Sequence, residues 1–321
     1  MNILDIFACP VCNGQLENAV DKYICKKCSS EYPIVNDVPV FLTEGTISDS
    51  MKSFWDKGWE NRFNNTDHTF LKDETHEELR KRIQDEVNSK LEENEHAITE
   101  TLPIDEKVIL NIGCGLREAP GFVLLGAKNY IGIDFSYFAA KYSHEVIKKL
   151  YGTGLTAQAN AEKLPINSGS INIVYSHGVL HHTPETQTTL DEIYRVLDSD
   201  GKGIIGLYNT WSATFITARV VGTIKSFFLR GSINWYQDGE GAWRTEENLN
   251  PWTKTYSLKE LKILFSKYEL YDLNFRKTSF SWANAIPKIG KHIARTHFGR
   301  YTARKLHSII GSMWVVTFKK K

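Results

Sequence analysis

The sequence has no long uninterrupted apolar run, and this argues against a membrane-spanning helix. A helix that crosses a bilayer needs about 18 or more consecutive apolar residues. The best candidate, residues 211–229, is interrupted by Arg219 and Lys225. Asp5 and the cysteines that soon follow it argue against a secretory signal peptide. We therefore expect a cytoplasmic protein without a transmembrane segment.

Acidic residues are missing from the C-terminal part of the chain. Residues 273–321 contain no Asp or Glu but eleven Lys and Arg, although the formal net charge of the whole chain is only +1. Such a segment could face RNA, a phosphate group or an anionic lipid. It could equally be a solvated surface that the acidic segment 60–106 neutralises. Charge alone leaves both interpretations open.

Cysteine is scarce, and its pattern indicates a metal site rather than disulfides. Four of the five cysteines form two Cys-x-x-Cys pairs, Cys9 with Cys12 and Cys25 with Cys28. Each pair directs two thiolates at one ion, and two pairs complete the tetrahedral shell that suits Zn²⁺. Four thiolates leave no open position, so we expect structural zinc that supplies folding energy to a small module. Gly14, next to the first pair, is expected to adopt a positive φ.

The segment around these cysteines has a recognisable relative. Residues 4–42, including the sequences Tyr32-Pro33-Ile34 and Val38-Pro39-Val40, resemble the small zinc-ribbon proteins that partner and activate tRNA and protein methyltransferases. The resemblance implies a zinc-ribbon module over residues 1–45, fused here to the remainder of the chain.

Residues 46–102 are polar and acidic and are predicted to form a helical linker. Apolar residues recur every fourth position within 74–97, which predicts a surface helix with one narrow apolar stripe. Before it come the aromatic residues Phe54, Trp55, Trp59 and Phe63. Aromatic side chains at near-helical spacing are usually part of a core, and otherwise they could line a substrate entrance.

The next segment has the pattern of a nucleotide-type cofactor site. Residues 108–112 form a short apolar run that ends in Gly113-Cys114-Gly115, where a glycine turn lets the backbone approach a ligand closely. A second predicted strand ends in Asp134, whose carboxylate could bind both hydroxyls of a ribose. Position 118 is Glu where the dinucleotide fingerprint has a third glycine, and this counts against NAD.

Further strand and helix patterns alternate along the chain. Predicted strands lie at 155–158, 171–175 and 202–208, with a helix at 190–197 before the last of them. Repeated strand–helix–strand units predict a parallel α/β sheet.

These segments together resemble the class I S-adenosyl-L-methionine (SAM) dependent methyltransferases, including the ubiquinone and menaquinone C-methyltransferases. The matching motifs are Gly113 with Gly115, Asp134, Asn160 to Pro165, and Val179 to His182. Two positions depart from the family pattern, because Asn111 and Asn160 stand where acids are usual.

The resemblance implies a Rossmann-like, mostly parallel sheet of seven strands, with the last two at 269–278 and 313–319. It places the methyltransferase domain at 103–321, with an aromatic insert at 209–257 and a basic insert at 281–311. It also implies SAM binding by a set of seven residues: Asn111, Gly113, Gly115, Asp134, Asn160, Ala161 and Ser176.

Methyl transfer to a hydroxyl or a carbon acid also needs a base. His177, His181 and His182 follow a predicted strand at the edge where open α/β sheets bind ligands, so each is a candidate catalytic base. The alternative is that these histidines shape the cofactor pocket or cap a helix.

Three functions remain open at this stage. The aromatic insert favours an apolar or ring-bearing acceptor, which means a small molecule or a lipid-like one, and peripheral membrane contact by 211–230 is compatible with this. The insert could also be a lid packed on its own core. The basic C-terminal part favours an rRNA or tRNA methyltransferase. A non-catalytic adaptor is the third candidate, and Asn111 and Asn160 are the hints toward it.

Overall fold

The computed structural model of the 321-residue chain defines most of two sheets and the helices around them. The residues described are 6–42, 49–65, 75–92, 103–104, 106–115, 121–122, 126–127, 129–151, 155–229, 252–280, 289, 292–293 and 296–321.

The N-terminal module is a small antiparallel sheet in which four strands pair in chain order. Its strands are β1 (Leu16–Ala19), β2 (Lys22–Cys25), β3 (Glu31–Val35) and β4 (Val38–Pro39). These short strands surround the cysteine pairs, as a ribbon does.

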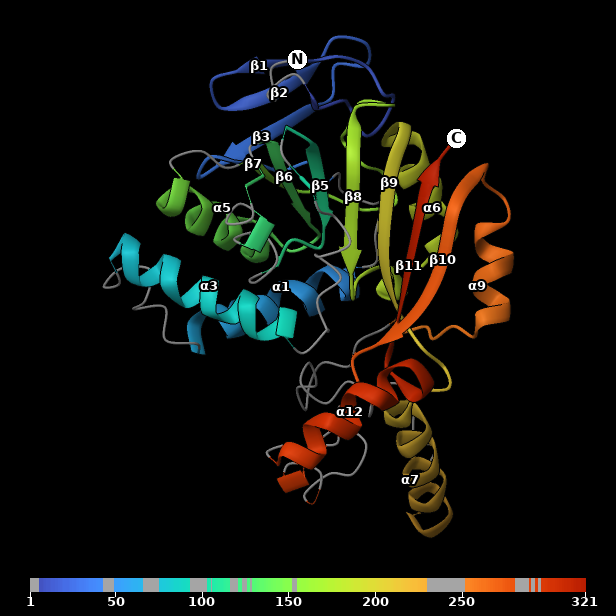
Figure 1. The fold of residues 1–321 in the computed structure, drawn as a ribbon. Coiled ribbons are helices and arrows are strands. Elements are labelled where there is room, and N and C mark those ends of the chain that lie inside the picture. The colour runs from blue at the N-terminus through green and yellow to red at the C-terminus, as the bar shows by residue number, and fades with distance from the viewer. Residues whose placement is uncertain are drawn as a thin grey trace.

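The main sheet has seven strands in the order β10-β11-β9-β8-β5-β6-β7, and it confirms the predicted Rossmann-like fold (Figure 1). Its strands are β5 (Val108–Ile112), β6 (Asn129–Asp134), β7 (Leu155–Gln158), β8 (Ile171–His177), β9 (Leu197–Tyr208), β10 (Leu270–Thr278) and β11 (Met313–Lys320). The pairs from β7 to β9 are all parallel, whereas β11 is antiparallel to both β9 and β10. Chain order reverses on the two sides of β5, and such a switch point opens a crevice at the carboxyl ends of the strands.

The helices are placed around this sheet as Figure 1 shows. They are α1 (Asp49–Asn65), α3 (His76–Glu92), α5 (Tyr137–Tyr151), α6 (Thr186–Val196), α7 (Ala213–Leu229), α9 (Leu258–Phe265) and α12 (His297–Ile310), with a 3₁₀ turn, η3 (Leu180–His182). In this view α7 and α12 project away from the sheet, below its other helices. No helix among the described residues is long and apolar enough to cross a membrane.

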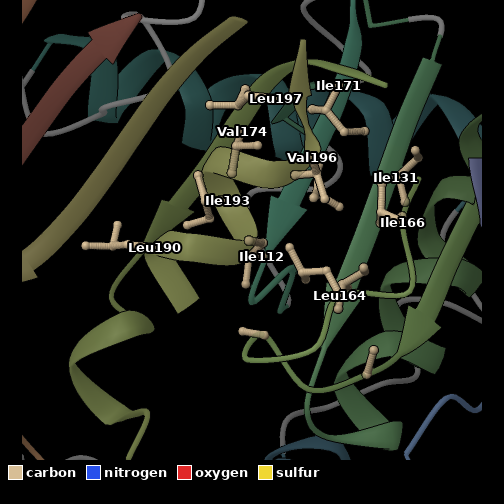
Figure 2. Close-up of a cluster of buried hydrophobic side chains, with 14 of the residues drawn as sticks. Ile112, Ile131, Leu164, Ile166, Ile171, Val174, Leu190, Ile193, Val196 and Leu197 are labelled. Carbon is tan, nitrogen blue, oxygen red and sulfur yellow. The ribbon is translucent and has the colours of Figure 1, made fainter. Parts of the chain in front are cut away.

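The core between α6 and the sheet follows from the apolar spacing of both elements. Leu190, Ile193 and Val196 recur on one face of α6 and are buried against Ile112 of β5 and Val174 of β8 (Figure 2). Fully burying a side chain of this size contributes about 1.5–3 kcal/mol. This packing fixes the strand ends, which carry the candidate site residues.

The ribbon covers the β7 edge of the main sheet. The backbone N–H of Phe41 donates to the carbonyl of Gln158 at 2.8 Å, and Val40 forms a parallel bridge with the same residue. Farther along, the N–H of Ala8 donates to the carbonyl of Pro165 at 3.0 Å. An exposed sheet edge can pair with other chains, and the ribbon prevents this at β7 because it occupies the edge.

Aromatic side chains fill the joint between the ribbon and the main sheet. The ring of Phe7 lies 5.0 Å from that of Phe41 and 5.8 Å from that of Tyr23, measured between centroids. All three are buried in one core cluster with Ile131 of β6 and Leu164. The two modules therefore share one continuous hydrophobic core.

Candidate metal cluster and cofactor cavity

The four cysteines of the two predicted pairs come together in the ribbon. The sulfur atoms of Cys9, Cys12, Cys25 and Cys28 all lie within 4.8 Å of one another. Four thiol ligands at such separations match the donor set of a structural zinc site. The hydroxyl of Tyr32 lies 3.1 Å from the Cys9 sulfur and is buried with it, so the ribbon core contacts the cluster directly.

The glycine of this cluster has a different role from the one we expected. Asn13, not Gly14, has a positive φ, at 54°. A Cβ atom at Gly14 would lie 3.1 Å from the sulfur atoms of Cys12 and Cys25 and 2.9 Å from Cβ of Lys27. Glycine is needed at this position because the two cysteine knuckles approach it closely.

A cavity of about 350 Å³ opens at the carboxyl ends of β5, β6 and β8. It lies at the switch point of the sheet, where open α/β folds bind ligands. The cavity is lined by Met51, Trp55, Trp59, Ile112, Gly113, Gly115, Ile133, Asp134, Phe135, Ala159, Asn160, Ala161, His177, Gly178, Val179, His182, Thr183, Pro184 and Tyr208.

The glycine turn after β5 forms one wall of this cavity. Gly113 has a φ of 76°, and a Cβ atom there would lie 2.1 Å from a methyl carbon of Val179. Gly115 has a φ of 40°, and its added Cβ would lie 3.3 Å from the ring of Trp59. Side chains would be strained at both positions, so the turn needs glycine for its conformation and for its close contacts.

Asp134 ends β6 at the same wall and is almost fully buried. Its carboxylate accepts the backbone N–H of Ser136 at 2.9 Å and that of Gly115 at 3.2 Å. Burial raises the pKa of Asp134 to about 7, and the negative charge of nearby Asp56 acts in the same direction. Asp134 therefore titrates near neutral pH.

Asn160 and Ala161 line the cavity from the segment that follows β7. The side-chain oxygen of Asn160 accepts the backbone N–H of Glu162 at 2.9 Å, which fixes the turn. If an adenine amino group of a bound cofactor donated to this oxygen, the oxygen would have to accept from both donors.

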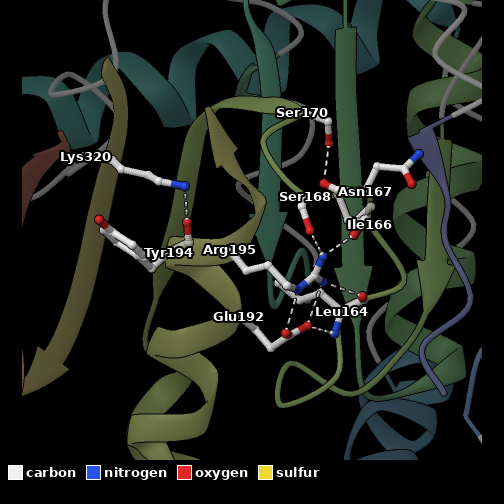
Figure 3. A network of polar contacts seen from close by, with 9 residues as sticks. All are labelled: Leu164, Ile166, Asn167, Ser168, Ser170, Glu192, Tyr194, Arg195 and Lys320. Carbon is white, nitrogen blue, oxygen red and sulfur yellow. Dashed lines mark hydrogen bonds and ion pairs between the residues drawn. The ribbon is translucent and has the colours of Figure 1, made fainter. Parts of the chain in front are cut away.

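Two charged residues of α6 hold the segment after Ala161 (Figure 3). Arg195 donates to the carbonyl of Leu164 at 3.0 Å and to that of Ile166 at 2.8 Å. Glu192 accepts the N–H of Leu164 at 2.7 Å and pairs with Arg195 at 2.7 Å. On its other side the segment bonds to the ribbon, so it is clamped between two elements.

Three of the predicted site residues are not among those that line the cavity. Asn111 is buried and donates its side-chain N–H to the hydroxyl of Tyr130 at 3.0 Å. Ser176 is buried and donates to the carbonyl of Ile112 at 3.0 Å. His181 is fully buried. The fold therefore turns these side chains toward the interior, which a linear motif does not reveal.

The three histidines occupy different environments. His177 and His182 line the cavity, whereas the ring of His181 stacks on Tyr208 with 3.7 Å between centroids. Among the described residues, neither ring nitrogen of His181 has a hydrogen-bond partner. Burial holds the pKa of His181 well below its usual value, and the neighbouring His182 and His177 lower it further.

His182 has a defined orientation. Its Nδ1 lies 3.1 Å from the carbonyl oxygen of Trp252. A carbonyl oxygen only accepts, so this contact favours the tautomer with the proton on Nδ1, in which Nε2 is the basic nitrogen. The hydroxyl of Thr253 also lies 3.4 Å from Nδ1. The rings of Trp55 and Tyr208 lie 5.2 and 5.7 Å from it, centroid to centroid.

Sequence reasoning did not assign α1 to the site. Met51, Trp55 and Trp59 recur every fourth residue on one face of α1, and all three line the cavity, while Phe54 is buried. The near-helical spacing of the aromatic residues was the signal in the sequence, and it was compatible with a core or with a substrate entrance. Each interpretation applies to part of the helix, because Phe54 belongs to the core and the two tryptophans line the cavity.

The helix α1 is tethered beside Asp134. One carboxylate oxygen of Asp56 accepts the hydroxyl of Ser136 at 3.0 Å and the backbone N–H of Tyr137, the first residue of α5, at 3.2 Å. A carboxylate at a helix N-terminus satisfies an otherwise unpaired donor. The tether therefore holds α1 over the cavity.

Comparison with known proteins agrees with this arrangement. The family described as "Methyltransferase domain" matches residues 110–205, which span the segment from β5 to β9.

Two curated relatives match the N-terminal region. A UPF0434 protein from Dechloromonas aromatica is 41% identical over 44 residues, which is 13% of this chain and 76% of the relative. A UPF0434 protein from Nitrosococcus oceani is 48% identical over 44 residues, covering 13% of this chain and 75% of the relative.

Among solved structures, one similar chain is a SAM-dependent methyltransferase from Thermotoga maritima, described as a possible histamine N-methyltransferase. It shares 18% identity and a TM-score of 0.46, over 84% of this chain and all of the other. The present chain is a SAM-dependent methyltransferase with an N-terminal region that belongs with the UPF0434 proteins and contains the four-cysteine cluster.

Proposed function

We propose that this enzyme transfers the methyl group of SAM to a small-molecule or lipid-like acceptor with an apolar or ring-bearing surface. One observation carries the proposal: a single cavity has the glycine turn and Asp134 on one wall and the aromatic residues Trp55, His182 and Tyr208 on another. The chain divides, on this proposal, into a ribbon (1–45), a helical linker (46–102) and a catalytic domain (103–321).

The cofactor would lie against Gly113, Gly115, Asp134, Asn160 and Ala161. The glycine turn offers a wall without side chains, and the carboxylate of Asp134 can accept hydrogen bonds from ribose hydroxyls. When bound, SAM supplies an electrophilic methyl group. Asn111 and Ser176 act behind this wall, because their side chains hold Tyr130 and the end of β5.

His182 is the candidate base that the contacts favour. Its Nδ1 proton is committed to the Trp252 carbonyl, so Nε2 can take a proton from an acceptor hydroxyl or carbon acid. His181 is too buried to reach an acceptor, and stacking on Tyr208 gives it a structural role. His177 lines the cavity and is the second candidate.

The aromatic wall supports an acceptor with apolar or planar surface. The rings of Trp55 and Tyr208 each lie within 6 Å of the His182 ring, centroid to centroid. Such walls bind rings by stacking and edge contacts, and they bind cationic groups over their faces. An acceptor of this kind would be positioned in line with the methyl group, which is the main task of the enzyme.

The proposed metal ligands are Cys9, Cys12, Cys25 and Cys28, with zinc in a structural role. A cytoplasmic location is compatible with free thiols.

Calorimetric titration of the purified protein with SAM, and with its demethylated product, tests the cofactor site. We expect micromolar binding of both and at least tenfold weaker binding by Asp134→Ala. Acceptor screening with labelled SAM then compares His182→Gln with His177→Gln, and we expect the larger loss of kcat in His182→Gln. A folded, zinc-loaded protein that binds neither ligand would exclude the enzyme and leave the adaptor.

A nucleic-acid acceptor is the second candidate, and the eleven basic residues of 273–321 without a single acid favour it. Nuclease treatment of the purified protein tests this candidate. Release of bound RNA by nuclease, together with methylation of that RNA, would place an rRNA or tRNA methyltransferase ahead of the small-molecule enzyme.

A further inference from the structure

The exposed face of α12 is apolar and basic where a solvated helix would be polar. Phe298, Tyr301, Lys305 and Ile309 follow one another at intervals of three and four residues, so they lie on one face of the helix. All four are exposed: Phe298 is 70% and Ile309 60% accessible to solvent. The opposite face holds buried His307, which bonds to the Phe280 carbonyl at 3.1 Å and anchors the helix.

The helix α7 and the turn before it present a similar surface. Ile216 and Val220 are exposed one turn apart, and Trp211 is exposed just before the helix. The guanidinium carbon of Arg219 lies 5.7 Å from the centroid of the Trp211 ring. On α12 the ammonium of Lys305 lies 4.7 Å from the centroid of Tyr301 in the same way. Neither helix contains an Asp or a Glu.

The N-terminal end of α7 and the C-terminal end of α12 lie together beside the cavity. Asn209, four residues before α7, donates its side-chain N–H to the carbonyl of Gly311, the residue after α12, at 2.8 Å. Tyr208 lines the cavity, and its ring lies 5.1 Å from that of Phe215 in α7. Both helices project from this end of the sheet (Figure 1).

We infer that the exposed faces of α7 and α12 dock this enzyme on an anionic lipid surface. A helix that lies in the membrane interface combines large apolar and aromatic side chains with Lys and Arg and lacks acids, as both helices do. Its basic groups match anionic headgroups, and the absence of any Asp or Glu from 273–321 removes repulsion along the whole C-terminal part. Scattered single exposed apolar residues are ordinary, but here they are arranged in stripes on helices that project from one end of the sheet.

Docking through this surface would bring the cavity close to an acceptor that lies in the membrane. A lipid-borne acceptor would enter the cavity beside Tyr208, where α7 begins, without leaving the membrane. Docking on lipid does not depend on the methyl transfer proposed above, whereas this delivery route does rest on it. Titration with SAM therefore tests one proposal, and vesicle binding by the same protein tests the other.

Sedimentation of the full chain with vesicles is the test. We expect binding to phosphatidylcholine vesicles that contain phosphatidylglycerol and little binding to phosphatidylcholine alone. Each apolar side chain that enters the membrane adds to the vesicle affinity. The triple variant Phe298→Ser, Tyr301→Ser, Ile309→Ser should therefore bind vesicles at least about tenfold more weakly than the unaltered protein. Lys305→Glu should reduce the preference for anionic vesicles, and raising the salt from about 0.05 to about 0.5 M should weaken binding.

The matched control is Ile263→Ser, because Ile263 on α9 is 60% exposed, like Ile309, but lies away from α7 and α12. It should bind vesicles like the unaltered protein, and unchanged melting temperatures would show that all variants fold. Absence of vesicle binding, or an equal loss in Ile263→Ser, would overturn the inference. RNA retention that Lys305→Glu abolishes, without vesicle binding, would assign the surface to nucleic acid. A dimer that the triple variant dissociates would assign it to a second copy of the chain.

Discussion

Asp134 is the residue where burial and ligand chemistry conflict most. The carboxylate is almost fully buried and receives N–H groups from Gly115 and Ser136, yet burial still raises its pKa to about 7. A buried carboxyl that accepts ribose hydroxyls must be ionised, and ionisation in the free protein is costly. On the proposed function, the cofactor and the proton would therefore compete for this group.

We expect SAM affinity to rise with pH between about pH 6 and about pH 8. Below the pKa of Asp134, which is about 7, a proton must leave before the carboxylate can accept the ribose hydroxyls. Calorimetric titration across this range measures the effect. Asp134→Asn should bind more weakly and should lose this part of the pH dependence, which also controls for ionisation of SAM itself. A wild-type affinity that does not change with pH would contradict the assignment.

The same group makes a prediction about stability. The folded-state pKa of Asp134 is raised from 3.8 to about 7, so the folded state holds this proton more tightly than the unfolded state does. Its contribution to stability is present below pH 3.8 and is lost as pH rises to about 7. The ligand-free Asp134→Asn protein should therefore melt at a higher temperature than wild type at about pH 8, with a smaller difference at about pH 5. Equal melting temperatures at both pH values would show that the carboxyl is not destabilised.

At the scale of elements, the helix α1 lines the cavity, and its residue Asp56 hydrogen-bonds to the residues that follow Asp134. Asp56 accepts from Ser136 and from the first N–H of α5, next to Asp134. The face that carries Trp55 and Trp59 is thereby held over the glycine turn. On the proposed function, this contact couples the position of α1 to the charge of Asp134.

Asp56→Ala should weaken SAM binding severalfold and destabilise the protein by about 1 kcal/mol, as the loss of a helix cap does. It should also move the midpoint of the pH dependence downward, because the charge of Asp56 raises the pKa of Asp134. Denaturant unfolding and SAM titration at several pH values measure both effects. Lys57→Ala, an exposed neighbour on the same helix, is the control and should change neither. A purely structural role of Asp56 would leave the midpoint in place.

Elements were more predictable from sequence than the directions of their side chains. The strands β5 and β7 begin and end at the residues predicted for them, 108–112 and 155–158. For β5 the signal was its apolar run, because buried parallel strands read as nearly continuous apolar segments between turns. His181 and His182 are adjacent in one motif, but only His182 reaches the cavity. That difference depends on packing against Tyr208 and on residue 252, and no local pattern encodes contacts over such separations.

At the scale of the whole molecule, the ribbon is bonded to the main sheet and shares its hydrophobic core. It pairs with Gln158 at the edge strand and with residues 165–167 beyond the cavity wall. Glu192 and Arg195 hold the same segment from the other side (Figure 3). Asn160 and Ala161 lie between these attachments, so the position of the cavity wall depends on the ribbon fold.

Zinc removal should therefore weaken SAM binding although the cysteine cluster lies outside the cavity. Without metal, the two cysteine pairs are no longer held together, and so small a module loses much of its folding energy. The backbone bonds from Ala8, Phe41 and Asn167 would then be lost, each contributing about 0.5–1.5 kcal/mol. We expect a lower melting temperature and at least about tenfold weaker SAM binding after chelation, with recovery when zinc is restored.

Metal content and SAM affinity, measured on the same chelated and reloaded samples of the full chain, decide this prediction. Val20→Ser provides the control, because Val20 is fully exposed on the ribbon between β1 and β2, so this variant should retain zinc and bind SAM normally. If the zinc-free protein bound SAM as tightly as the zinc-loaded protein, the contacts from Glu192 and Arg195 would be sufficient to position the cavity wall without the ribbon. The ribbon would then be a separate module whose contact with the sheet edge serves another purpose than cofactor binding.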